Sequence, residues 1–479
     1  MVLMRSHRGW HTCGCRAVAV VLATIGVART AGAQAEDGRR VYDEQLRVQL
    51  DQQLPEAREV GVDGGGWLSF ALFHFDDAGA RTERVLRQYQ LRGWGSVNVR
   101  GVHRAYVRAL LGYRDWNSGK NPDEPHGDQF SGFEIERAWY QFDLGQMLKN
   151  RTGKEPAFGF RVKAGRQFYE MGSGLVLSMP LDMVRFNAHA GDWQLEALLG
   201  KTIHETRNID DSAPVADHQR RCLWGGQLTY TGLDRHRPYA YFLDNQDSTK
   251  PDPADATQGY GYSSRYVGAG SEGSVLLPNL RYRVEAVGEF GQTYSDGVTA
   301  GRDDICAMAS DVLLEYLFRK AATRPRISFE HLWASGDDDR QLSATSTIGG
   351  NLAGTTDNAF NTFGFRDTGL AFSPRVSNLH MYAFGASFFP LRGCGGKLFK
   401  KMEVGSKVFL YHKSSSGAVS DTTATAGTRW LGWEWDVYCN WRLTSDLSWT
   451  IRYGAFMPGS AFEDRSCRQF LLTGINLSF

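Results

Sequence analysis

Apolar and polar residues alternate with a period of two in several segments. The clearest segment runs from 431 to 442, where Leu431, Trp433, Trp435, Val437, Cys439 and Trp441 alternate with Gly432, Glu434, Asp436, Tyr438, Asn440 and Arg442. Successive side chains of a strand point to opposite faces of a sheet, whereas a helix would scatter this pattern around its axis. The alternation therefore predicts a strand with one face toward lipid and the other toward water.

The same alternation recurs elsewhere. Met402, Val404, Val408 and Leu410 share one face, as do Tyr282, Val284, Ala286 and Phe290. In the segment 468–479 the shared face is formed by Leu471, Thr473, Ile475, Leu477 and the final aromatic residue, Phe479. These repeats predict an all-β chain rather than a single amphipathic strand.

Applied to the whole chain, this pattern predicts an antiparallel transmembrane β-barrel. The expected strands lie near 67–75, 84–99, 101–114, 131–143, 157–168, 175–189, 192–203, 220–231, 237–245, 260–271, 279–294, 304–319, 324–336, 377–390, 400–413, 428–442, 446–457 and 468–479, about 18 in all. An even number places both ends of a bacterial barrel in the periplasm. The alternation is weak in the first expected strand, and if one pair of strands is misplaced, the barrel would have 16 strands.

The expected connections alternate between two lengths, as such barrels require. The longer ones, assigned to the outer side, are 115–130, 204–219, 246–259, 337–376 and 414–427. The shorter, periplasmic ones include 190–191, 232–236, 320–323 and 443–445, with 144–156 and 391–399 as long exceptions.

The N-terminal residues predict export. Arg5, Arg8 and Arg16 precede the apolar run 17–28 and the small residues 31–33, which is the order of regions in a secretory signal peptide. Residues 1–33 are therefore expected to be removed. Residues 34–66 then form a periplasmic leader, with a short helix as one option because Leu46, Leu50 and Leu54 share a helical face. The barrel is expected over 67–479.

Composition supports strands and tight turns: the chain has 54 Gly, 14 Pro, 27 Phe, 19 Tyr and 13 Trp. Residues 1–33 hold four Arg and no acid, so the mature part keeps 50 basic residues against 53 acidic ones, a net charge of about −3. Bulk charge thus identifies no partner, and nothing predicts nucleic-acid binding.

The five cysteines of the mature part are widely spaced and do not suggest a metal site. Cys394 and Cys439 could form one disulfide bond at the periplasmic rim.

Several segments resemble the alginate export family of outer-membrane barrels. They are Gly165-Arg166-Gln167, Ser335-Gly336-Asp337-Asp338-Asp339, Ser377-Asn378-Leu379-His380 and the stretch 431–462. The aromatic C-terminal strand also resembles the signal that the barrel-assembly machinery recognises. The resemblance implies an 18-stranded barrel in the outer membrane that carries an anionic polyuronate outward through a narrow basic pore.

Strand parity independently predicts which side chains face the lumen. The expected pore-lining bases are Arg92, Arg100, Arg104, Arg108, Arg161, Lys163, Arg185, Arg281, Arg283, Arg326, Lys407, Arg442 and Arg452, with Arg221 and Lys401 on the same faces. The acids expected there are fewer: Glu196, Asp244, Glu285, Glu289, Asp311, Glu315, Glu330, Glu403, Glu434 and Asp436. A net basic tube concentrates anions, although bases and acids on neighbouring strands could also simply neutralise each other.

These observations predict a channel, without cofactor or metal, for an anionic polysaccharide. No Ser–His constellation, metal motif or nucleotide-binding loop indicates an enzyme. The expected partners are the polysaccharide or small anions, outer-membrane lipid, the barrel-assembly machinery and periplasmic export proteins. Two alternatives remain: a porin for small organic anions, and a structural or adhesive barrel whose acidic loops bind divalent cations.

Overall fold

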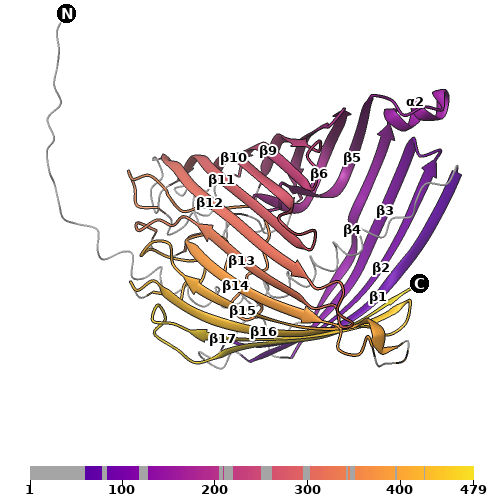
Figure 1. Cartoon of the computed structure of the whole chain (residues 1–479). Helices are drawn as coiled ribbons and strands as arrows, with labels where there is room; N and C mark the ends of the chain where they lie inside the picture. The colour runs from indigo at the N-terminus through magenta and orange to yellow at the C-terminus, as the bar shows by residue number, and fades with distance from the viewer. Residues whose placement is uncertain are drawn as a thin grey trace, which may run out of the picture.

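The chain folds into one closed antiparallel barrel (Figure 1). The computed structural model describes residues 60–77, 83–117, 128–203, 209, 220–249, 261–294, 302–340, 343–345, 351–393, 396, 398–425 and 427–479. The strands are β1 (Val60–Asp76), β2 (Arg84–Val99), β3 (His103–Trp116), β4 (Asp128–Asp143), β5 (Phe158–Met171), β6 (Leu177–Ala190), β7 (Trp193–Thr202), β8 (Arg221–Tyr230), β9 (His236–Asp247), β10 (Tyr262–Ser274), β11 (Leu280–Tyr294), β12 (Arg302–Leu317), β13 (Arg326–Ala334), β14 (Leu379–Phe388), β15 (Met402–His412), β16 (Trp430–Arg442), β17 (Leu447–Pro458) and β18 (Arg468–Ser478).

Each strand pairs with its neighbour in sequence, and β1 pairs with both β2 and β18, which closes an 18-stranded sheet. The closing register runs from Trp67 opposite Ser478 to Asp76 opposite Gln469. Beyond it, the Gly66 and Phe479 backbones exchange two hydrogen bonds of 2.9 and 3.0 Å. The prediction of 18 strands is confirmed, and the option of 16 is excluded. β1 is longer than predicted, since it begins at Val60 rather than at residue 67.

Lipid-facing and lumen-facing side chains alternate along the wall. In β16, Trp433 and Trp435 are exposed on the outer face, whereas Glu434 is fully buried inside. Leu431 departs from the predicted parity and is also fully buried. The cause is an irregularity in the β15–β16 register next to Gly432, whose φ of 126° favours glycine and reverses the side of the preceding side chain.

The periplasmic connection after β4 contains a helix that the strand pattern did not predict, α2 (Leu144–Thr152). Asp143 caps its start by accepting a hydrogen bond from the Gln146 N–H at 2.9 Å, and Gly153 ends it with a φ of 71°. A 3-10 turn, η1 (Phe399–Lys401), precedes β15. Among the described residues, no helix is long and apolar enough to cross a membrane. Residues 1–59 and Cys394 lie outside the described part, so the signal peptide, the leader helix and the Cys394–Cys439 bond stay predictions.

Candidate functional site

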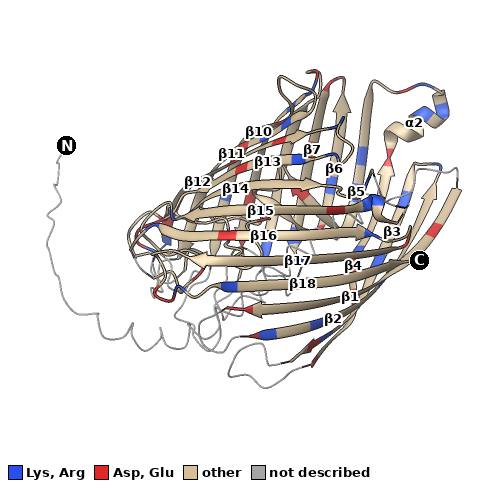
Figure 2. Ribbon diagram, turned by 60° about the horizontal axis from the view of Figure 1, so that its bottom comes forward, with Lys and Arg blue, Asp and Glu red and all other residues tan. Residues whose placement is uncertain are grey.

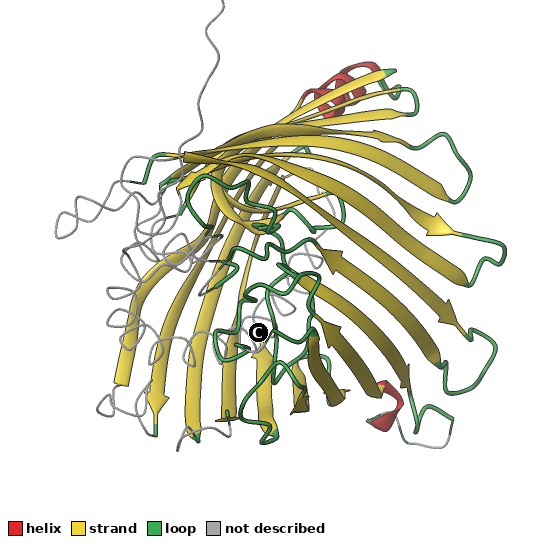
Figure 3. Ribbon diagram, turned by 90° about the vertical axis from the view of Figure 1, so that its left-hand side faces the viewer, coloured by secondary structure: helices red, strands yellow, loops and turns green. Residues whose placement is uncertain are grey.

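The long connection between β13 and β14 spans residues 335–378, and its described residues (335–340, 343–345 and 351–378) fold into the barrel and narrow the lumen (Figure 3). Phe360, Phe363 and Phe372 of this connection, hereafter the constriction loop, are at most 2% exposed and pack among side chains of the inner wall. Phe363 forms a parallel bridge with Leu177 at the start of β6. The larger of the two buried apolar clusters among the described residues therefore joins the wall and the loop.

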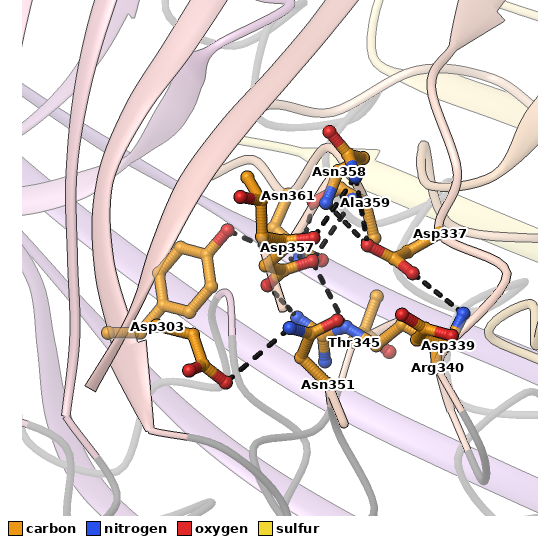
Figure 4. Close-up of polar contacts among 12 residues, drawn as sticks. Asp303, Asp337, Asp339, Arg340, Thr345, Asn351, Asp357, Asn358, Ala359 and Asn361 are labelled. Atoms are coloured by element: carbon orange, nitrogen blue, oxygen red, sulfur yellow. Dashed lines mark hydrogen bonds and ion pairs between the residues drawn. The ribbon is translucent and has the colours of Figure 1, made fainter. Parts of the chain in front are cut away.

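The base of the loop is held by a polar cluster (Figure 4). Arg340 and Asp357 form a buried ion pair, and Asp357 also accepts a hydrogen bond from the Ala359 N–H at 3.0 Å. Asp337 accepts one from the Asn358 N–H at 2.7 Å. Asp338 accepts hydrogen bonds from Ser416, and these lower its pKa. These contacts show that carboxylates of the acidic run 337–339 tie loop segments together.

Two buried carboxylates of the wall hold the rest of the loop by its backbone. Glu434 of β16 accepts hydrogen bonds from three consecutive N–H groups, those of Leu370, Ala371 and Phe372, at 2.5, 2.7 and 2.8 Å. Glu289 of β11 accepts one from the Asn361 N–H at 2.8 Å. Both acids face inward as predicted, but they bind the loop instead of lining a water-filled passage.

Charged side chains of the loop add two further attachments. Arg366 pairs with Asp311 of β12 at 3.0 Å, and Asp367 pairs with Lys407 of β15 at 2.6 Å. Burial alone would raise the pKa of Asp367, but the Lys407 ammonium and the hydrogen bond it donates hold that pKa below its ordinary value. Lys407 was predicted to line the pore, but its charge is largely paired with Asp367, and this ion pair holds the loop.

The tip of the β5–β6 hairpin also bends into the lumen. The ladder between β4 and β5 ends at the pair Ala138–Arg166, although β5 continues to Met171. Beyond that point, the hairpin tip contacts the far wall: the Ser173 N–H donates to Glu285 of β11 at 2.7 Å. The hairpin tip and the constriction loop together reduce the width of the lumen.

A cavity of about 470 Å³ lies beside these two elements. Its charged lining carries both signs: Arg326, Lys407 and Arg452 face Glu170, Asp367, Glu403 and Asp436. Arg326 lies 3.4 Å from both Glu315 and Glu403. The narrow part of the lumen is therefore close to electrically balanced, and the predicted excess of base is not found there.

Basic side chains outnumber acidic ones on one wall, which is formed by the lumenal faces of β2 to β5 on the periplasmic side of the constriction loop. Figure 2 marks the charged positions along the ribbon. In register, six basic side chains face inward (Arg92, Arg104, Arg108, Arg137, Arg161 and Lys163) against three carboxylates, Glu134, Glu136 and Asp143. We call this set the basic wall. A register shift in β4 turns Glu136 inward, where it pairs with Arg92 at 3.1 Å and Arg108 at 3.0 Å.

The other predicted bases are spread around the barrel. Arg185 pairs with Glu196 at 2.5 Å, and Arg283 with Asp311 and Glu330 at 2.9 and 3.2 Å. Arg281 lines a second cavity of about 450 Å³ near the periplasmic end. Arg221, fully buried, pairs with Asp247 at 2.8 Å.

Three predicted positions differ from the lumenal strand sites expected of them. Arg100 lies in the β2–β3 turn with a φ of 51°, because a tight connection between paired strands needs the left-handed conformation there. Lys401 belongs to the 3-10 turn before β15. Asp244 faces outward, where it forms an ion pair of 3.0 Å with Arg265, its partner on β10. The prediction that Asp244 lines the lumen is therefore wrong, because a shift of one residue along a strand moves a side chain to the opposite face. Arg442 stays on β16 but donates to the Ser445 carbonyl in the following turn.

The family model for alginate export matches residues 79–470, most of the chain and nearly all of the barrel. The chain belongs to the alginate export family. It is thus an outer-membrane β-barrel channel, and the predicted resemblance is confirmed. No curated protein matches this chain.

Solved structures with the same fold include OccK5 (OpdH) and the outer membrane protein OpdK, both from Pseudomonas aeruginosa. OccK5 (OpdH) is 11% identical with a TM-score of 0.53, covering 87% of this chain and 98% of its own. OpdK is 10% identical with a TM-score of 0.53, covering 88% and 99%. At such low identity, these likenesses show the barrel fold alone.

Proposed function

We propose that this channel passes an anionic polysaccharide, a polyuronate such as alginate, through its lumen along the basic wall. The observation that carries the proposal is the local charge: six bases against three carboxylates on one inner wall, in a chain whose mature part is expected to carry a net charge of about −3. Such a surface concentrates polyanions within a Debye length, about 8 Å at physiological ionic strength.

The arrangement of the bases suits passage rather than tight capture. Arg92 and Arg108 share Glu136 and are at most 1% exposed, so they supply a fixed positive background. Arg161 is half exposed although Asp143 lies 2.9 Å away, which leaves its guanidinium within reach of a solute. An Arg fork can hold one carboxylate through two hydrogen bonds, and several weak sites in series allow a chain to move.

A porin for small organic anions is the second candidate. The cavity of about 470 Å³ beside the constriction loop has the size of a small-molecule site and carries both charge signs. One solved structure of the same fold is OpdK with vanillate, 10% identical with a TM-score of 0.50. This reading requires the constriction, rather than the basic wall, to select the solute.

Planar-bilayer measurements separate the two. We expect wild-type channels to prefer anions and to be blocked by polyuronates added on the periplasmic side. The triple variant Arg104→Gln, Arg161→Gln, Lys163→Gln should lose most of that block and part of the anion preference. Arg108 is left intact, because its loss would leave the buried Glu136 with less compensation.

The control variant removes the same charge outside the lumen, through Arg319→Gln, Lys320→Gln and Arg465→Gln, all at exposed connections. It should behave as wild type. Cation preference of the wild type, or equal polyuronate block of the wild type and the triple variant, would exclude the basic wall as the polysaccharide path. Block by vanillate-sized acids without block by polyuronates would favour the small-anion porin.

A further inference from the structure

A row of aromatic rings crosses the basic wall on β1 to β4. Trp67 lies 6.4 Å from Trp94, Trp94 lies 6.0 Å from Tyr106, and Tyr106 lies 5.5 Å from Trp139, measured between ring centroids. Successive rings are inclined by only 27°, 23° and 21°. The Lys163 ammonium ends the row 3.8 Å from the Trp139 ring centroid. Four strands thus contribute one continuous line of rings with a cation at its end.

Register places the row on the lumenal face. Trp67 shares the β1 face of Phe73, which is fully buried in a cluster with Leu370 of the constriction loop. Tyr106 lies between Arg104 and Arg108 on the inward face of β3, and it pairs directly with Trp139 of β4. The rings therefore belong to the same surface as the bases of the basic wall.

The row lies in the periplasmic part of the lumen. Trp67 is opposite Ser478, the last residue of β18. The outer face at this height carries its own aromatic group, in which His103 contacts Tyr140 and Phe142 at 6.1 and 5.5 Å. Aromatic rings on the outer face are expected where a barrel meets the membrane interface. That explanation does not apply to rings that face the lumen.

Tyr106 is buried, but the three indole rings of the row are not part of the buried core. Trp67, Trp94 and Trp139 are only partly buried and belong to neither buried apolar cluster. The indole N–H groups of Trp333, Trp435, Trp441 and Trp449 all donate to protein acceptors, whereas those of Trp67, Trp94 and Trp139 meet no acceptor among the described residues. These three partly buried indoles therefore present N–H donors and an apolar ring face to the lumen, which suits a ligand that is both polar and apolar.

We propose that this row is a saccharide-binding site at the periplasmic entrance, with an acidic sugar chain as its ligand. The C–H bonds of pyranose rings pack against the aromatic rings, sugar hydroxyls accept hydrogen bonds from the indole N–H groups, and uronate carboxylates lie near Lys163 and Arg104. The choice of an acidic sugar rests on the proposed function; the aromatic contacts would hold a neutral sugar as well. The row and the basic wall together would admit a sugar chain and orient it below the constriction loop.

The test uses the full-length channel with Trp94→Ala and Trp139→Ala combined, and a matched pair, Trp193→Ala and Trp433→Ala, on the outer face. Heat-modifiable migration on gels first establishes that each variant forms a barrel. Block of single channels is then titrated with an oligouronate and with a neutral malto-oligosaccharide from the periplasmic side. The apparent Kd of both should rise at least about tenfold in the inner pair, a loss of ~1.4 kcal/mol. The outer pair should match wild type.

A second readout is tryptophan fluorescence, which should change on adding either sugar to wild type and much less in the inner pair. The variant with Phe at 94 and 139 should bind with intermediate strength, because it keeps rings but loses two N–H donors. If the inner pair binds both sugars as wild type does, the aromatic site is refuted while polyuronate passage can stand. If wild type binds only the neutral sugar and the inner pair loses it, the site stands and polyuronate transport falls.

Discussion

Replacing Glu434 by Ala tests how the constriction loop is held. The substitution removes the acceptor of three backbone N–H groups, at 2.5 to 2.8 Å, in a place where Glu434 is fully buried. Hydrogen bonds to a charged group contribute about 1.5–3 kcal/mol each, but three bonds to one carboxylate are not additive. We therefore expect the closed arrangement of residues 368–372 to lose about 4 kcal/mol.

That loss would raise the population of a detached segment about a thousandfold, since each ~1.4 kcal/mol is a factor of ten. The rest of the loop should stay, because Lys407 still binds Asp367 and Arg366 still pairs with Asp311. Single-channel recordings should show a higher and noisier conductance. Glu434→Gln should be intermediate, because its amide offers one acceptor oxygen but turns an NH₂ toward the remaining N–H.

Glu463→Ala, at an exposed site between β17 and β18, is the control and should leave the recordings unchanged. A folded Glu434→Ala channel with wild-type conductance and noise would refute the view that this carboxylate holds the loop in the lumen. If the Glu463→Ala control also changed conductance or noise, the effect would have to be assigned to the outer loops in general.

Three further predictions concern topology, assembly and pH. A cysteine introduced at Thr425, which is exposed on the long-loop side, should react with an impermeant maleimide on whole cells, and one at Ser445 should not; the reverse result would invert the orientation. Deleting Phe479, whose backbone completes the β1–β18 seam, should reduce the heat-modifiable folded form, and an unchanged yield would argue against its role in assembly. Because the pKa of Asp367 is lowered in the folded protein, its stabilising pairing with Lys407 is fully present above its ordinary value of 3.8 and lost as pH falls through the lower folded value. Conductance should therefore stay constant from neutral pH to about 4 and rise only at lower pH, and Lys407→Met should move that rise to higher pH.

Much of the wall could be predicted from the sequence because a transmembrane strand obeys a local rule. Every second side chain must suit lipid, so residues such as Trp433, Trp435 and Ile475 reveal strand and face without knowledge of partners. The rule fails where the backbone is irregular. Gly432 and the shift in β4 each reverse parity, which explains the buried Leu431 and the inward Glu136. Helix α2 carried a readable signal, the Asp143 cap and Gly153 stop, which a search for strands alone overlooks.

The interior was decided by tertiary structure. Nothing periodic in residues 335–378 indicates that the loop turns inward, because its attachments are single contacts with residues distant in sequence, such as Glu289 to Asn361 and Glu434 to Leu370. Parity showed that Arg92 and Lys407 face the lumen, but only the fold shows that Glu136 and Asp367 take up much of their charge. Alternation is a property of one strand and can be read along the chain. The net charge and width of a lumen depend on contacts between side chains of different strands and loops. Those contacts form only once the barrel has closed.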